Sequence, residues 1–231
     1  MGSGSCLIDY DGDKDLDIFF VQGAPLPGWE KEGTLRNQLF RNEGGQFINV
    51  TGESGLGETS YGSGCSVADY DNDGDSDLYI TNFGEDILYR NEGNGTFADV
   101  SATSGPGMKV ARVSHGAVFG DWDNDGDTDI FISDSDTPHC TLLRNDGGNG
   151  NHYLTVRAVG TRSNRDGIGA RVRAVAGDLV QTREIRRGYG YMGSNDVRLL
   201  LGLGANARMD TLEVRWPSGA VQVLADIAAG Q

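Results

Sequence analysis

The chain is poor in the residue types on which most catalytic and zinc sites depend. Its 231 residues include only three histidines and three cysteines, and their spacing fits no zinc motif. Five prolines, and 36 glycines without a triplet period, exclude collagen. No apolar run approaches the roughly 20 residues that a transmembrane helix needs, so no membrane span is expected. The chain also opens without the basic and apolar regions of a signal peptide.

Positive charge is scarce and unevenly placed. The net charge is −15, and residues 1–151 carry 27 acids and 8 bases, whereas residues 152–231 carry 7 acids and 11 bases. The acidic part would repel nucleic acid, so a divalent cation is its more natural partner. The change of composition near His152 marks a boundary in the chain.

The three cysteines, Cys6, Cys65 and Cys140, are an odd number with no recognisable framework. One disulfide is possible, but the interpretation we favour is that they are small buried apolar side chains. Cysteine content therefore says little about the cellular compartment.

The strongest feature of the sequence is an internal repeat. Asp9-Tyr10-Asp11 recurs 60 residues later as Asp69-Tyr70-Asp71, and 52 residues further on as Asp121-Trp122-Asp123. A downstream Arg-Asn-acid-Gly motif recurs at 41–44, 90–93 and 144–147. Because Gly2-Ser3-Gly4 matches Gly62-Ser63-Gly64, the chain is expected to begin inside a repeat, with an N-terminal part and its secretion signal upstream.

Each unit is expected to form four short strands, in the second copy around 65–68, 78–82, 87–90 and 96–100. Glycine, asparagine and aspartate separate them, and no segment shows a sustained helical period. Such units of about 50–60 residues are typical of propeller blades. The third copy lacks the last strand, and the first holds a surface insertion at 22–35. A closed ring needs roughly 4–8 blades, so three units require further blades or association.

The fold class that follows is all-β: a partial β-propeller followed by a small β-sheet domain. The expected domains are three blades over 1–150 and a β domain over 151–231. Strands are expected in the second domain at 152–157, 170–176, 179–185, 197–201 and 211–216, where apolar and polar residues alternate.

Each repeat contains a nine-residue loop with aspartates at positions 1, 3, 5, 7 and 9. Five carboxylates so close together repel one another, which is the physical reason to expect a cation between them. Calcium takes 6–8 oxygen ligands in a flexible shell, whereas magnesium prefers a strict octahedron and zinc prefers histidine or cysteine. By analogy with the EF-hand loop, positions 1, 3, 5 and 9 donate carboxylate oxygens and position 7 donates its backbone carbonyl. The expected calcium ligands are Asp9, Asp11, Asp13, Asp15, Asp17, Asp69, Asp71, Asp73, Asp75, Asp77, Asp121, Asp123, Asp125, Asp127 and Asp129.

The first loop departs from the pattern at position 6. Gly74 and Gly126 permit the sharp turn in the second and third loops, but Lys14 stands there in the first. A lysine in a left-handed conformation costs about 1 kcal/mol, and its charge lies near the ion. Weaker calcium binding is expected at this loop.

The repeats over residues 2–147 resemble FG-GAP (VCBS-type) repeats, the calcium-loop blades of integrin-α-like propellers. The segments NHYLTVRAVGTRSNRDGIGARV at 151–172, RRGYGYMGSND, LGLG and VRWPSG resemble the ASPIC/UnbV domain. This combination is similar to the cartilage-acidic-protein family. The resemblance implies a secreted or cell-surface, calcium-binding protein with no established enzymatic activity.

The sequence leaves three functions open. The favoured one is a non-enzymatic binding or adhesion module, in which calcium rigidifies the blades and rim loops meet a protein or glycan. The alternative is a glycan-active enzyme, or its carbohydrate-binding accessory part, using Trp29, Tyr189 and Tyr191. A spacer that binds only calcium is a third possibility. Extracellular calcium modules work at roughly 10⁻⁴–10⁻³ M, which favours the cell exterior, the cell surface or the periplasm.

One polar turn in the C-terminal part has two interpretations. Its arginines could clamp a carboxylate or sulfate, or the turn could be structural and closed by salt bridges, which we favour. It contains Arg162, Asn164, Arg165 and Asp166.

Overall fold

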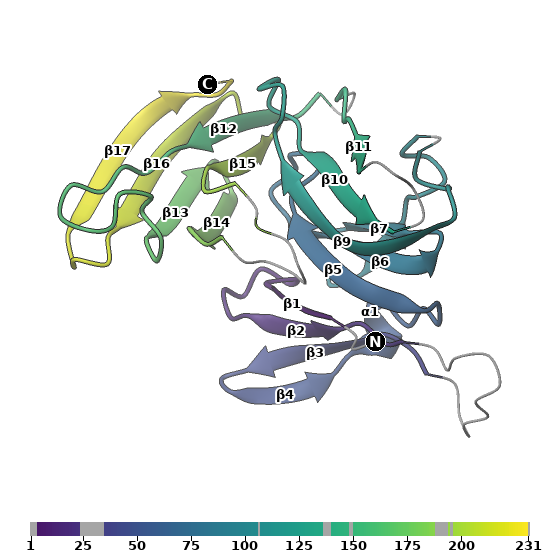
Figure 1. The fold of residues 1–231 in the computed structure, drawn as a ribbon. Helices are drawn as coiled ribbons and strands as arrows, with labels where there is room; N and C mark the ends of the chain where they lie inside the picture. The colour runs from purple at the N-terminus through teal and green to yellow at the C-terminus, as the bar shows by residue number, and fades with distance from the viewer. Residues whose placement is uncertain are drawn as a thin grey trace.

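The computed structural model describes residues 4–23, 35–105, 107–135, 140–147, 150–187, 194 and 196–230. These residues form seventeen strands and a single helical turn, α1 (Thr51–Ser54), which confirms the expected all-β fold (Figure 1). No helix in the described ranges has the length and apolar character needed to cross a bilayer.

The repeats form three antiparallel units, which we call the first, second and third blade. β-Branched and aromatic residues are frequent in these strands and favour the extended backbone. The first blade consists of β1 (Ser5–Ile8), β2 (Asp17–Phe20), β3 (Gln38–Glu43) and β4 (Gln46–Asn49). The second consists of β5 (Gly62–Ala68), β6 (Asp77–Gly84), β7 (Ile87–Asn91) and β8 (Phe97–Asp99). The third consists of β9 (Arg112–Gly120), β10 (Asp129–Asp134) and β11 (Thr141–Leu143).

The boundaries of these strands agree with the repeat in the sequence. All four strands of the second blade lie where they were expected, and the third blade shows three strands in its described part. The second and third blades also share two residue pairs, Phe83 with Val113 and Gly84 with Arg112, which join β6 to β9.

The blades pack face to face, so that one face of each covers the opposite face of the next. Phe19 on the first blade and Ile80 on the second, both fully buried, belong to one core cluster. Tyr79, on the other face of β6, belongs to the next cluster, where its ring meets Phe119 edge-on at 6.3 Å between centroids. Burial of these two apolar layers holds the stack together.

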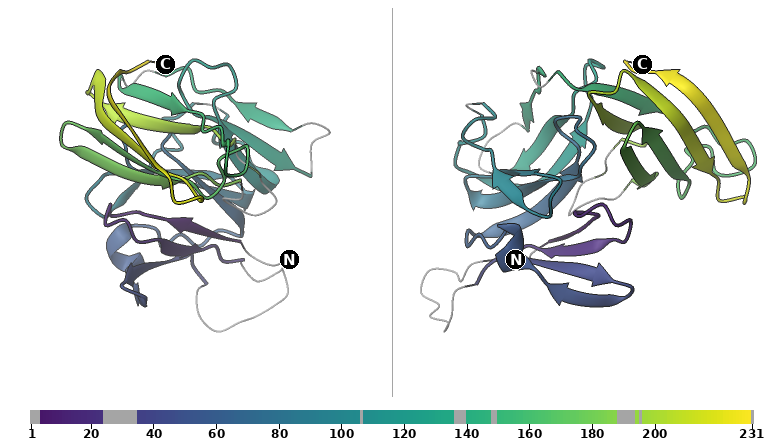
Figure 2. Two further views of the ribbon diagram at one scale, coloured as in Figure 1. Left: turned by 90° about the vertical axis from the view of Figure 1, so that its left-hand side faces the viewer. Right: turned by 180° about the vertical axis from the view of Figure 1, so that it is seen from behind.

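The two outer faces of the stack remain open. Phe20 is 40% exposed, whereas Ile80, at the equivalent position of the second blade, is 0% exposed. At the other end Trp122 is 60% exposed, although its counterpart Tyr70 packs against the core between the second and third blades. The described blades therefore form an open arc (Figure 2).

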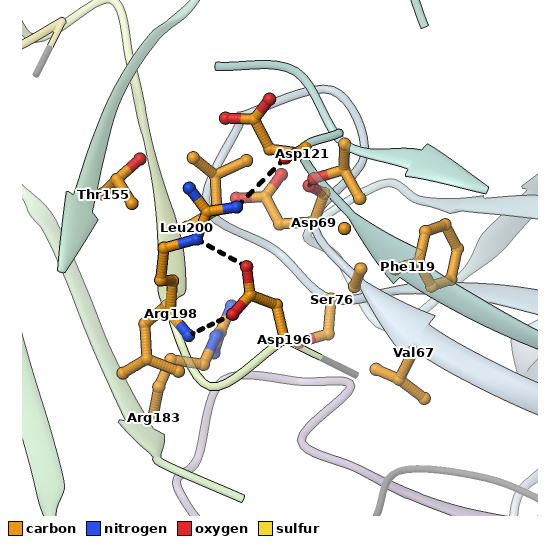
Figure 3. A pocket seen from close by; sticks show the side chains of 14 residues that line it. Val67, Asp69, Ser76, Phe119, Asp121, Thr155, Arg183, Asp196, Arg198 and Leu200 are labelled. Carbon is orange, nitrogen blue, oxygen red and sulfur yellow. Dashed lines mark hydrogen bonds and ion pairs between the residues drawn. The ribbon is translucent and has the colours of Figure 1, made fainter. Parts of the chain in front are cut away.

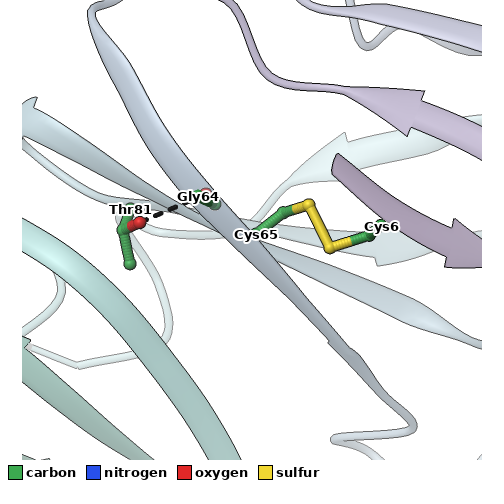
Figure 4. The surroundings of a disulfide bond; sticks show 4 residues. All are labelled: Cys6, Gly64, Cys65 and Thr81. Atoms are coloured by element: carbon green, nitrogen blue, oxygen red, sulfur yellow. Dashed lines mark hydrogen bonds between the residues drawn. A yellow bond between two sulfur atoms is a disulfide. The ribbon is translucent and has the colours of Figure 1, made fainter. Parts of the chain in front are cut away.

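A disulfide joins Cys6 on β1 to Cys65 on β5 (Figure 4). The expectation that both are unpaired apolar side chains was therefore wrong. The two residues lie on blade faces that pack against each other, and this brings together thiols that are 59 residues apart in the sequence. Cys140 has a free, exposed thiol.

The described residues between 151 and 230 form what we call the C-terminal unit. Strand β12 (His152–Val156) pairs with β15 (Leu199–Gly204), and a second sheet has the order β14 (Leu179–Glu184), β13 (Arg171–Ala176), β16 (Arg208–Arg215), β17 (Val221–Ala228). Alternating apolar residues of these strands form a core of their own. Five of the six strands were expected from the sequence, and β17 was missed. The division into domains at residue 150 stays a prediction.

Candidate metal centres

The three aspartate loops, at residues 9–17, 69–77 and 121–129, share one backbone shape. In each loop the fourth and sixth residues have positive φ. The fourth residues are Gly12 (76°), Asn72 (60°) and Asn124 (60°), and the sixth are Lys14 (77°), Gly74 (102°) and Gly126 (94°). Two left-handed residues curl the chain back on itself within nine residues, as a loop around an ion requires. Lys14 adopts the strained conformation expected from the sequence.

Carboxylates at the first and fifth positions stabilise this curl. In the second loop, Asp69 accepts hydrogen bonds from the backbone N–H groups of Asp73 (3.1 Å) and Gly74 (3.0 Å). The fifth residue accepts one from the N–H of the seventh in all three loops, at 2.8–2.9 Å. Such bonds from a side chain to a nearby N–H are the usual way in which aspartate closes a tight turn.

The aspartate at the ninth position has a separate structural role. Asp77 Oδ2 accepts from the N–H of Tyr70 (2.8 Å), and its Oδ1 accepts from the N–H of Asn91 (2.8 Å). Asp17 and Asp129 make the same two bonds with their own repeats. All three are 0% exposed. The ninth aspartate thus ties the start of its loop to the downstream asparagine, a role that the sequence analysis did not foresee.

The loop shape brings three carboxylates together in each repeat. Ligand atoms lie within 4.8 Å of one another for Asp9, Asp11 and Asp13, for Asp69, Asp71 and Asp77, and for Asp121, Asp123 and Asp129. Six of the expected ligands lie outside these described groups, namely Asp15, Asp17, Asp73, Asp75, Asp125 and Asp127. For Asp15, Asp75 and Asp127 the expected donor is the backbone carbonyl, so their carboxylates were not expected to converge.

Several of the converging oxygens have no hydrogen-bond donor. Asp9 Oδ1, Asp71 Oδ1, Asp121 Oδ1 and Asp123 Oδ1 are buried and unpaired among the described residues. A buried carboxylate oxygen without a partner is costly unless a cation meets it. The donors are hard oxygens, and no histidine or cysteine joins the described groups, so the residues fit calcium better than zinc.

Burial raises the pKa of several aspartates in these loops, so that they are harder to ionise when no cation is bound. In the second loop, burial raises the pKa of Asp69 to about 7 and the pKa of Asp71 to about 6, the latter with help from the charge of Asp73. Burial is also the main cause that raises the pKa of Asp17 to about 6. The pKa of Asp121 rises as well, through burial. A divalent cation would favour the ionised forms and oppose these shifts.

Comparison with known families identifies the repeats that contain these loops. The model of the FG-GAP-like repeat matches residues 9–80 and 69–132, more than half of the chain, and each match begins at the first aspartate of a loop. The chain belongs to the FG-GAP-like repeat family. This FG-GAP-like protein also matches the model described as ASPIC and UnbV, over residues 160–231.

Individual relatives agree with this assignment. Over 97 residues the FG-GAP-like protein is 32% identical to cartilage acidic protein 1 of Xenopus tropicalis, and 32% identical to that of Mus musculus. Each match covers 42% of this chain and 15% of the relative, so the matched segment is a small part of those proteins.

Other candidate residues have less support. In the turn at 162–166, Asn164 bonds both the N–H and the carbonyl of Ile168, and Asp166 pairs with Arg187 at 2.7 Å. The structural role favoured from the sequence stays a prediction. Trp29, Tyr189 and Tyr191, proposed for a sugar-stacking face, lie outside the described residues.

Proposed function

We propose that this chain is a calcium-binding, non-enzymatic binding module that works outside the cytoplasm. The observation that supports the calcium proposal most directly is the set of buried carboxylate oxygens without donors, repeated in three loops of one shape. The bound calcium would be held by the converging aspartates and would rigidify the turns that join the first two strands of each blade.

The role as a binding module rests on how the aspartates are used. The conspicuous acidic residues are committed to loop closure and to metal ligation, which suits a scaffold better than acid–base chemistry. A protein or glycan is the proposed ligand, and the blade rims are its proposed site. The disulfide and the likeness to cartilage acidic protein 1 support a location outside the cytoplasm.

Isothermal calorimetry with calcium chloride tests the metal proposal. The purified protein should release or take up heat at millimolar calcium or below, and Asp71→Asn and Asp123→Asn should each weaken binding at their own loop by about tenfold or more, because each removes charge from a group of three carboxylates. Glu53→Gln is the control, since Glu53 is exposed on α1, away from the loops. Absence of any calcium-dependent heat in the unmodified protein would refute the proposal.

A panel of polysaccharides tests the claim that the module is not an enzyme. Incubation of the calcium-loaded protein with each polysaccharide should give no new reducing ends. Catalytic turnover that is lost on changing one acidic residue outside the three loops would establish the glycan-active alternative.

A further inference from the structure

The C-terminal unit lies directly against the second and third aspartate loops, with no room for a further side chain at three glycines of the contact. A Cβ atom on Gly202 would lie 2.1 Å from Asp69 Oδ2, and one on Gly126 would lie 1.9 Å from the ring of Tyr153. A Cβ on Gly74 would meet the side chain of Leu179 at 2.7 Å. Glycine at these three positions therefore allows the loops and the C-terminal unit to approach each other closely. Two of the three glycines, Gly74 and Gly126, belong to the loops.

Hydrogen bonds from the C-terminal unit end on backbone carbonyls of the second loop. The N–H of Gly204 donates to Asn72 O at 2.9 Å, and Arg183 Nη2 donates to Gly74 O at 3.0 Å. Asn151 Nδ2, just before β12, donates to Asp71 O at 2.9 Å. These carbonyls belong to the third, fourth and sixth residues of the loop, so the C-terminal unit contacts the part of the loop whose left-handed residues give it its shape.

The third loop is held by one arginine. Arg198 Nη1 donates to Asn124 Oδ1 at 2.7 Å, and its Nη2 donates to Asp121 O at 3.1 Å. Asp196 orients the guanidinium through a bond of 2.5 Å to Nε (Figure 3). A cavity of about 130 Å³ lies beside this contact, lined by both loops and by the C-terminal unit.

The two loops are also joined to each other. Asn72 Nδ2 donates to Gly126 O and to Asp127 Oδ1, both at 3.0 Å. The loops and the C-terminal unit thus form one connected set of polar contacts, in which the shape of each loop determines where its carbonyls point.

We propose that calcium binding at the second and third loops and docking of the C-terminal unit are coupled, each strengthening the other. The proposal rests on calcium binding by the loops. When the carboxylates are ionised and no cation lies between them, their repulsion opens the loop and moves the carbonyls away from Asn151, Gly204 and Arg198. Linkage is reciprocal, so contacts that hold the loop in its curled shape raise its affinity for the cation by the same factor.

Substituting Arg183 or Arg198 would not test this coupling clearly. Their positive charge repels a cation, whereas their hydrogen bonds order the loop, so the two effects on calcium affinity have opposite signs. Asn151 is uncharged, and its contact to Asp71 O isolates the ordering effect. Asn164 offers a control, since its Nδ2 also donates to a backbone carbonyl, that of Ile168 at 2.7 Å, in a turn of the C-terminal unit whose described hydrogen bonds do not reach the loops.

Calorimetry of the full chain with calcium chloride is the first arm of the test. Asn151→Ala should weaken calcium binding about fivefold, the effect of losing its hydrogen bond to Asp71 O, whereas Asn164→Ala should leave the affinity unchanged. Equal affinities for the two variants would overturn the coupling. If the unmodified protein shows no calcium-dependent heat, then the proposed calcium function fails as well, which distinguishes the two failures.

Hydrogen exchange of the unmodified protein is the second arm, and it does not depend on any variant folding. Saturating calcium should slow exchange in the segment 200–206, which contains the Gly204 N–H, by about tenfold or more relative to calcium-free buffer. The segment 208–215 in β16, which is paired on both sides within its own sheet, should change much less. An equal change in the two segments, or none in either, would overturn the proposal.

Discussion

Lys14 occupies a position where the other two loops have glycine. Its φ of 77° is strained for a residue with a Cβ atom. Lys14→Gly should therefore raise the free energy of unfolding by about 1 kcal/mol and should also strengthen calcium binding at the first loop. Urea denaturation with and without calcium measures both effects.

Lys14→Ala separates the two causes, because alanine removes the charge but keeps the Cβ atom. If alanine stabilises the protein as much as glycine does, the strain is not the reason for the effect.

The buried carboxylates of the second loop predict an unusual pH dependence for the metal-free protein. The pKa of Asp69 is about 7 in the folded chain, against about 3.9 for an unfolded aspartate. The folded state then binds more protons, so the stability that this group contributes is fully present below about pH 4 and is lost as the pH rises to about 7. Asp71, with a pKa of about 6, acts in the same direction.

Melting temperatures in calcium-free buffer should therefore fall between pH 5 and pH 8. With saturating calcium they should fall less or rise, because protons compete with the ion for the same oxygens. A metal-free protein that becomes more stable across this window would contradict the assignment of these shifts to burial.

At the residue scale, the sequence predicted the loops and the left-handed sixth position. It did not reveal the left-handed fourth position, because glycine stands there in the first loop and asparagine in the other two, so no single residue type marks it. Nor did it reveal the role of the ninth aspartate. In the second loop this residue is Asp77, and its partner Asn91 lies 14 residues further along the chain. The repeated Arg-Asn-acid-Gly motif was the available signal, and only pairing between strands gives it a meaning.

At the scale of elements, the disulfide is a covalent cross-link between the first and second blades. It closes a loop with a sequence separation of 59 residues, which restricts the unfolded chain substantially. Replacing both Cys6 and Cys65 with alanine should lower the free energy of unfolding by about 2–4 kcal/mol, as measured by urea denaturation.

Cys140→Ala provides the comparison, because this thiol is free and exposed. It should change the free energy of unfolding by less than about 0.5 kcal/mol. Similar losses for the two variants would show that the disulfide itself does not stabilise the protein.

Most strands could be predicted because each lies between glycine- and asparagine-rich turns. Strand β17 was missed although a Pro217-Ser218-Gly219 turn precedes it, since its residues are largely exposed and show little alternation of burial. The disulfide could not be predicted, because pairing Cys6 with Cys65 requires knowing which faces of two blades meet.

At the scale of the whole molecule, equivalent positions on successive blades differ in burial. Ile80 is covered by the first blade, whereas no described residue covers its counterpart Phe20 to a similar extent. Ile80→Ala should destabilise the protein by about 2–5 kcal/mol, and Phe20→Ala by about 1 kcal/mol or less. Chemical denaturation of the two variants measures the difference, and equal losses would contradict the order in which the blades are stacked.

The asparagines at the blade junctions have a consequence for how such chains can lengthen or shorten. Asn91 Nδ2 donates to Tyr10 O of the preceding loop, and Asn145 Nδ2 donates to Tyr70 O in the same way, both at 2.9 Å. The second unit thus carries both a donor for the unit before it and an acceptor for the unit after it. A unit copied in tandem brings both halves of the junction with it, so gene duplication can change the number of units without inventing a new interface.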